Sequence, residues 1–190
     1  MPVCMPFGSL WLPVLVSAAV VWIASAIAWM AMPHHKSDFK KLPDEAGMTE
    51  LLRKMALAPG QYLLPFMGDH KQMKDPAFCK RLEEGPLASI RIQKNGMPKM
   101  GPQLVTYFAY CVLVSFLVGY IARHTLDFGA ERLIVFRLTG TVAIAAYTMA
   151  LIPESIWMWR PWNVTWKSVF DSIVYGILTG AIFACLWPKG

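Results

Sequence analysis

Four long apolar runs alternate with polar segments along this chain of 190 residues. The first run covers residues 9–32 and contains no charged residue. The others cover about residues 102–122, 133–152 and 168–187. Since about 20 helical residues cross the hydrocarbon core of a bilayer, each run is long enough to span it. We therefore predict a membrane protein of the all-α class, with four transmembrane helices and one hydrophilic insert between the first two.

The first run differs from a signal peptide in two respects. It is far longer than an h-region of about 7–15 residues, and no Lys or Arg precedes it. We expect it to be retained as the first helix.

The hydrophilic insert, residues 33–101, has the pattern of a small α/β unit. A helix is predicted to begin at Pro43, with apolar residues every three or four positions until Pro59. A second short helix is expected from Asp75 to Gly85. Alternating apolar residues predict a strand after each helix, at Tyr62-Leu64-Phe66 and at Ala88-Ile90-Ile92.

Basic residues are concentrated in the insert, which holds twelve of the eighteen Lys and Arg together with eight of the twelve Asp and Glu. No Lys or Arg precedes Pro33. Cytoplasmic segments beside membrane spans carry an excess of Lys and Arg. We therefore predict a cytoplasmic insert with both termini outside. The interleaved signs of charge disfavour a nucleic-acid partner, and the expected partner is the lipid bilayer.

Two segments have the composition of membrane-interface anchors. Imidazole and ammonium groups just after the first span can meet lipid phosphates, and indole rings favour the interface. The residues with this expected role are His34, His35, Lys36, Lys40, Lys41, Trp157, Trp159, Trp162 and Trp166.

Small residues recur every four positions on the fourth apolar run. Such a ridge allows another helix to approach closely, either within the bundle or from a second chain. The ridge therefore predicts a protein partner or a homo-oligomer through the fourth helix, unless it is used internally. Its members are Ser172, Gly176, Gly180 and Ala184.

Few ionisable residues lie inside the apolar runs. Arg137 is about one turn inside the third run and can reach the headgroup layer. Asp171 is expected in the first turn of the fourth helix, where the helix dipole favours a carboxylate. Tyr107 and Tyr110 add polarity to the second helix, so a solute path would use these tyrosines and Arg137.

The segment after the first span also raises the question of a metal site. His34, His35 and Asp38 lie close in sequence, and His70 is the other His expected on the same side. Adjacent residues of an extended chain point in opposite directions, and a metal site needs three or four convergent ligands. We therefore predict no metal site and no cofactor, with these four residues as the candidate ligands if a metal binds.

The run PHHKSDF-x-x-LPDE after the first span, followed by APGQY, resembles uncharacterised bacterial multi-pass membrane proteins over about residues 29–66. The resemblance implies a location in the bacterial inner membrane. It implies no activity and transfers no functional residue.

The sequence contains no motif of a known catalytic or nucleotide-binding site. The leading hypothesis is a non-catalytic membrane protein that serves as a structural or accessory subunit of a larger assembly. One alternative is a small transporter or channel. Another is an enzyme at the membrane interface that uses His34, His35 and Asp38.

Overall fold

The computed structural model describes residues 6–189, which are mostly helical and divide into two compact units. One unit consists of the chain up to Phe39 and from Lys99 onward, and the other is Lys40–Pro98. Within residues 6–189, four helical stretches are long and apolar enough to cross a membrane, and one small sheet has two strands. The prediction of four such helices is confirmed. Their bounds are Gly8–Ala31, Met100–Thr125, Arg132–Trp157 and Trp162–Leu186.

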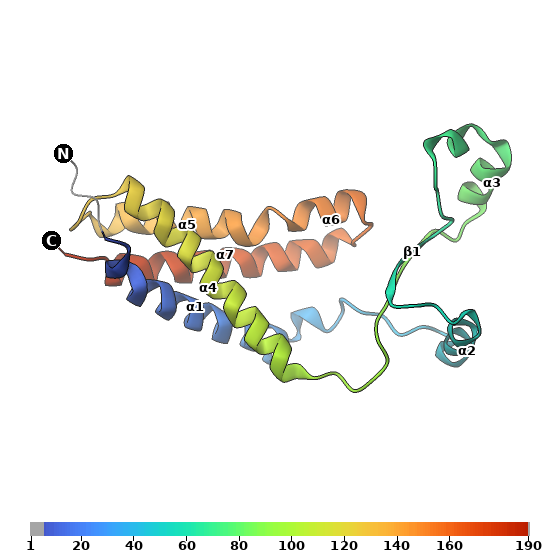
Figure 1. The fold of residues 1–190 in the computed structure, drawn as a ribbon, viewed down its shortest axis with the longest axis horizontal. Coiled ribbons are helices and arrows are strands. Elements are labelled where there is room, and N and C mark those ends of the chain that lie inside the picture. The colour runs from blue at the N-terminus through green and yellow to red at the C-terminus, as the bar shows by residue number, and fades with distance from the viewer. Residues whose placement is uncertain (1–5, 190) are drawn as a thin grey trace. The chain divides into compact units, whose positions relative to one another are not determined.

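The helical unit is an antiparallel bundle in which α5 lies alongside α7, and α1 packs against both α4 and α7 (Figure 1). A short 3-10 turn precedes α1, a π-helical turn continues it, and another 3-10 turn follows. The elements are η1 (Phe7–Leu10), α1 (Trp11–Ala26), η2 (Ile27–Ala31), η3 (Pro33–His35), α4 (Met100–Thr125), α5 (Arg132–Thr148), α6 (Leu151–Trp157) and α7 (Trp162–Leu186).

The closest packing in this unit joins α5 to α7 through glycine. A Cβ placed on Gly180 would lie 3.0 Å from both the Cα of Gly140 and the carbonyl oxygen of Phe136. A Cβ on Gly176 would lie 3.1 Å from the carbonyl oxygen of Gly140. The two helix backbones can come into contact here because glycine has no side chain to hold them apart. The small-residue ridge is used inside the chain, and a second chain could reach these glycines only by displacing α5.

Contacts between distant segments close one end of the bundle. The indole nitrogen of Trp187 donates a 3.0 Å hydrogen bond to the carbonyl oxygen of Asp127. The amide of Gly129 donates a 2.9 Å bond to the carbonyl oxygen of Pro188. The α4–α5 connection is thereby fixed to the C-terminal end of α7.

The bounds of the third and fourth helices differ from the sequence prediction. The third was expected to stop at Pro153, but α5 ends at Thr148 and Pro153 lies in the first turn of α6. Proline is tolerated there because first-turn amides have no partner within the helix. The fourth helix begins at Trp162, six residues before the predicted start. Asp171 is therefore in the third turn of α7, so the expected dipole explanation for its charge is wrong.

The insert unit contains the expected helices and strands. Helix α2 (Glu45–Met55) is capped by Asp44, whose carboxylate accepts a 2.9 Å bond from the amide of Gly47. The 3-10 turn η4 (His70–Lys74) precedes α3 (Pro76–Glu84). Strands β1 (Gly60–Leu64) and β2 (Ala88–Ile92) pair antiparallel, with Tyr62 opposite Ile90. Phe66 was expected in the first strand but lies beyond it, after Pro65, which has no amide to extend the ladder.

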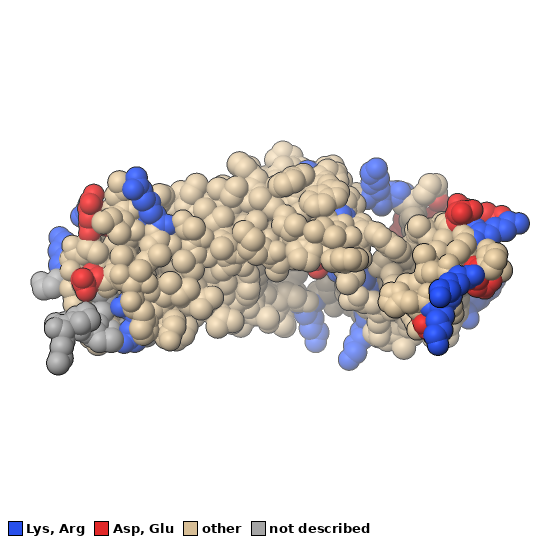
Figure 2. All heavy atoms as spheres, turned by 90° about the horizontal axis from the view of Figure 1, so that it is seen from above, with Lys and Arg blue, Asp and Glu red and all other residues tan. Residues whose placement is uncertain are grey.

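The two units differ in how much they bury. Nearly all buried side chains belong to the helical unit, and Phe78 is the only fully buried one that the structure describes between residues 40 and 98. On the face drawn in Figure 2, the middle of the helical unit carries few charged side chains. That distribution matches a surface in contact with lipid more closely than one in contact with water.

Candidate functional site

A cluster of charged side chains joins the segment after α1 to the first half of α7. Met32 is extended, and Pro33–His35 then forms one 3-10 turn. The turn brings the rings of His34 and His35 to the same side, with centroids 4.1 Å apart. The expectation that these adjacent imidazoles point in opposite directions is wrong, because the backbone here is helical rather than extended.

Both imidazoles contact Asp171, which lies more than 130 positions later in the chain. The Nε2 atom of His34 is 3.1 Å from Asp171 Oδ1, and that of His35 is 2.6 Å from Asp171 Oδ2. His35 is 6% exposed and Asp171 is equally buried. The carboxylate thus receives one ring on each oxygen in a place largely closed to solvent.

A second carboxylate completes the cluster. Asp38 Oδ2 lies 2.6 Å from His35 Nδ1, and Lys167 Nζ donates a 2.6 Å bond to Asp38 Oδ1. Lys167 also donates a 2.8 Å bond to Ser37 Oγ. Burial alone would raise the pKa of Asp38, but the bonds from Lys167 and His35 outweigh burial and hold this pKa below its usual value.

Acidic and basic side chains alternate through the cluster. Asp171 and Asp38 bond opposite nitrogens of the His35 ring, and Asp38 also accepts from the ammonium of Lys167. Pairing of this kind is what allows charges to be buried at all.

The cluster is held firmly from the side of α1. The indole ring of Trp29, on the π-helical turn, stacks on His35 with centroids 3.9 Å apart and planes within 6°.

The Nδ1 atom of His34 is buried and makes no hydrogen bond to any residue between 6 and 189. One ligand atom each from His34, His35 and Asp171 lies within 4.8 Å of the other two, so these three residues could hold a metal ion.

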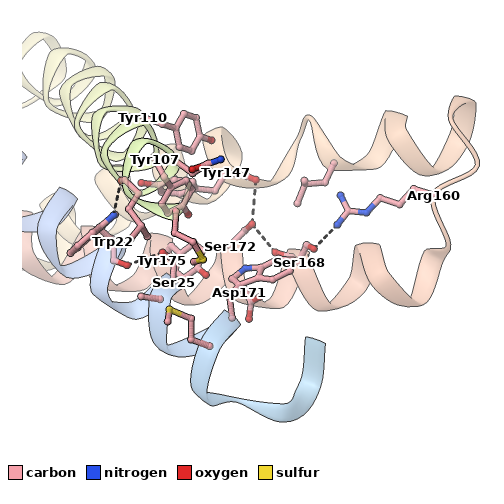
Figure 3. Close-up of a pocket in the computed structure, with 17 residues that line it drawn as sticks. Trp22, Ser25, Tyr107, Tyr110, Tyr147, Arg160, Ser168, Asp171, Ser172 and Tyr175 are labelled. Atoms are coloured by element: carbon pink, nitrogen blue, oxygen red, sulfur yellow. Dashed lines mark hydrogen bonds between the residues drawn. The ribbon is translucent and has the colours of Figure 1, made fainter. Parts of the chain in front are cut away.

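A cavity of about 520 Å³ lies beside this cluster, between α1, α4 and the α5–α7 pair (Figure 3). Ligand pockets typically occupy about 300–1,000 Å³. Most of its wall is aromatic or aliphatic, and the exposed side chains of Trp29, Met30 and Met100 form part of the rim. Asp171 belongs both to the wall of the cavity and to the charged cluster.

Polar groups gather along one side of the cavity. Arg160 donates a 2.8 Å bond to Ser168 Oγ, and the hydroxyl of Ser172 donates to the carbonyl oxygens of Ser168 and Tyr147 (Figure 3). The hydroxyl of Tyr175 is buried in the cavity wall without a hydrogen-bond partner among the described residues. A buried hydroxyl normally has a partner, so a polar atom of a bound molecule or a water is expected beside Tyr175.

The structure separates the residues that the sequence grouped as a polar path. Tyr107 and Tyr110 line the cavity with their rings 5.8 Å apart. Arg137 is exposed on α5 and does not line this cavity. His70, a candidate ligand by sequence, belongs to the insert unit, where it is exposed.

The expected interface residues divide into two groups. His34 and His35 point into the cluster, while the lysines of the same segment and the indoles around α6 and α7 are exposed. The exposed members are Lys36, Lys40, Lys41, Trp157, Trp159, Trp162 and Trp166.

Sequence reasoning missed Asp171 as the partner of the two histidines and Lys167 as the partner of Asp38. The signal available was their spacing of four residues, which places them on one face of a helix that begins before Lys167.

Comparisons with protein-family models, with curated proteins and with solved structures each find no match to this chain.

Proposed function

We propose that this chain is a multi-pass membrane protein that binds a small amphipathic molecule in the cavity between α1, α4, α5 and α7. The observation that carries the proposal is the cavity itself, with apolar walls and a polar side that contains the unpartnered hydroxyl of Tyr175. A lipid-like molecule with a compact polar group has the matching chemistry.

The apolar rim of the cavity supports entry of the ligand from the lipid rather than from water. The rim residues Trp29, Met30 and Met100 are apolar and exposed, and an apolar molecule dissolved in the bilayer would meet them first. Its hydrocarbon part would pack on Trp22, Tyr107 and neighbouring side chains. Its polar part would lie beside Ser172 and Tyr175, where hydroxyl groups can donate and accept.

Extraction of the purified protein tests this proposal. The protein would be prepared in a mild detergent, extracted with organic solvent, and analysed by mass spectrometry against a detergent blank. We expect one amphipathic compound in a fixed ratio to the protein. Ala26→Trp, which adds an indole to the cavity wall, should remove it. Ala181→Trp, at an exposed position of α7 outside the cavity, should retain it. Equal recovery of the compound from both variants would refute the proposal.

The topology proposed for this protein places the insert unit in the cytoplasm and both termini outside a bacterial inner membrane. The basic residues at the edges of the insert support this orientation. The connection between α4 and α5 would then be external. A protease added to sealed, right-side-out vesicles should leave the insert intact, and after inversion of the vesicles it should cleave there. Cleavage of the insert in right-side-out vesicles, and not in inverted ones, would reverse the proposed orientation.

A second candidate function is that of an accessory subunit, and the insert unit is the observation that favours it. Its apolar residues are largely exposed, with Phe66 at 71% and Met97 at 90%. A unit with so small a core gains stability when a partner covers it. Purification in mild detergent should then recover a second protein in fixed ratio. Recovery of this chain alone would leave the ligand-binding function as the only proposal.

A further inference from the structure

We propose that His34, His35 and Asp171 form a binding site for one divalent transition-metal ion. The inference is independent of what the neighbouring cavity binds, because none of its three ligands depends on an occupant there. It rests on the donor set, on the geometry of the donors, and on the side chains behind them.

The donor atoms already lie close to a coordinating arrangement. They are the Nε2 atoms of the two imidazoles and the carboxylate of Asp171, whose Oδ1 lies 3.1 Å from His34 and whose Oδ2 lies 2.6 Å from His35. Metal–ligand bonds of about 2.0–2.1 Å in a tetrahedron place neighbouring ligand atoms roughly 3.3 Å apart. An ion would therefore require the His35–Asp171 separation to open by about 0.7 Å, with the three donors, which lie within 4.8 Å of one another, adjusting around it.

The residues behind His35 are those that a metal-binding imidazole requires. A ligating His usually donates its other ring N–H to a carboxylate, which fixes the ring and raises its basicity. His35 Nδ1 is 2.6 Å from Asp38, and Lys167 in turn bonds Asp38. Trp29 stacked on the ring further restricts its orientation. His35 is thus held in position by Asp38 and Trp29, which would not themselves be ligands.

The donor set selects a class of metal. Two imidazoles and one carboxylate suit zinc or iron(II), whereas magnesium and calcium prefer sites made only of oxygen atoms. Three protein ligands leave at least one coordination position for water or another molecule. Asp171 also lines the cavity. Only the side chain of Asp171 would therefore separate the open coordination position from a molecule bound in the cavity.

Zinc titration tests the site directly. The full chain would be purified without a polyhistidine tag, treated with a chelator, and titrated with Zn²⁺ by calorimetry in mild detergent. We expect one equivalent of Zn²⁺ for the wild type. Asp38→Asn should weaken binding by about 10–100-fold while leaving all three ligands in place. Co²⁺ bound in place of Zn²⁺ should give the visible absorption of a low-coordinate site.

His34→Gln is the variant that decides the outcome. The side chain of His34 is 24% exposed, the most accessible of the three, and Gln keeps a polar group of similar length. We expect His34→Gln to melt near the wild-type temperature and to lose zinc binding. Asp171→Asn should also lose zinc binding. His70→Ala and His124→Ala are the controls, since both rings are exposed and lie outside the cluster, and both variants should bind like the wild type.

Two results would overturn the inference. If the wild type takes up no more Zn²⁺ than the detergent blank, the cluster is held by hydrogen bonds alone. If His34→Gln binds one equivalent with unchanged affinity, the metal occupies another place in the chain.

Discussion

The helical unit and the insert unit are built from the same chain but stabilised in different ways. In the helical unit, apolar side chains from four helices share one core, two helix backbones touch at glycine, and charges are buried in pairs. In the insert, hydrogen bonds within caps and one two-stranded ladder hold the short elements, and Phe78 is the only fully buried side chain that the structure describes there. A change in the helical unit should therefore be felt throughout that unit, while a change in the insert should stay local.

Loss of Asp171 should have the largest effect. Asp171→Ala leaves His34 and His35 without a shared partner in a nearly closed site, and breaking a buried pair costs about 3–5 kcal/mol. The free energy of unfolding in mixed micelles, followed by titration with a denaturing detergent, should fall by that amount. Asp127→Ala removes an exposed carboxylate in the α4–α5 connection and should change it by less than about 0.5 kcal/mol. Similar losses for both would show that the cluster is not specially stabilising.

Phe78→Ala should have the next largest effect, and it should show that the two units lose stability independently of each other. Removal of a buried Phe costs about 3–5 kcal/mol in a packed core, and the low end applies because Phe78 has few buried neighbours. Amide hydrogen exchange should accelerate between residues 40 and 98 and stay unchanged in α5 and α7. Phe66→Ala, at a side chain 71% exposed, serves as the control and should leave both regions as they are. Faster exchange in α7 of the Phe78 variant would contradict the independence of the units.

A methyl group between α5 and α7 should have a smaller effect. In Gly180→Ala the new carbon would meet backbone atoms at 3.0 Å, so the helices must separate slightly, and such overpacking costs about 1–3 kcal/mol. Gly101→Ala adds the same methyl to α4 in open space and should be neutral or stabilising by up to about 1 kcal/mol. Unfolding titrations of the two variants measure the difference. A Gly180→Ala variant as stable as wild type would mean that the two helices can move apart freely.

The exposed ion pair on α2 should matter least. Lys54 bonds Glu50 one turn earlier at 2.8 Å, with both side chains about 70% exposed. Pairs of this kind contribute about 0.3–0.5 kcal/mol, so Lys54→Ala should barely change hydrogen exchange in α2. Arg53→Ala, at the adjacent position with no ion pair in the described residues, is its control. A larger effect of Lys54→Ala than of Phe78→Ala would overturn this description of the insert.

Much of the fold follows from local patterns in the sequence. Apolar runs predict the four long helices, and turn and cap residues such as Asp44 and Asp75 predict the short helices of the insert. The charged cluster could not be predicted in this way. It depends on a single 3-10 turn at Pro33–His35, which hydropathy does not reveal, and on α7 beginning at Trp162. Apolarity marks the part of a helix that lipid would cover, whereas α7 continues beyond it through Lys167.

The cluster can form only late in the synthesis of the protein. His34 and His35 bond a residue 137 and 136 positions later, and Asp38 bonds one 129 positions later. A ribosome that adds about 5–20 residues per second produces the histidines several seconds before Asp171 exists. During that interval the segment after α1 has none of its partners from α7. These side chains gain their partners only after α7 has been made, so the contacts form late in the assembly of the bundle.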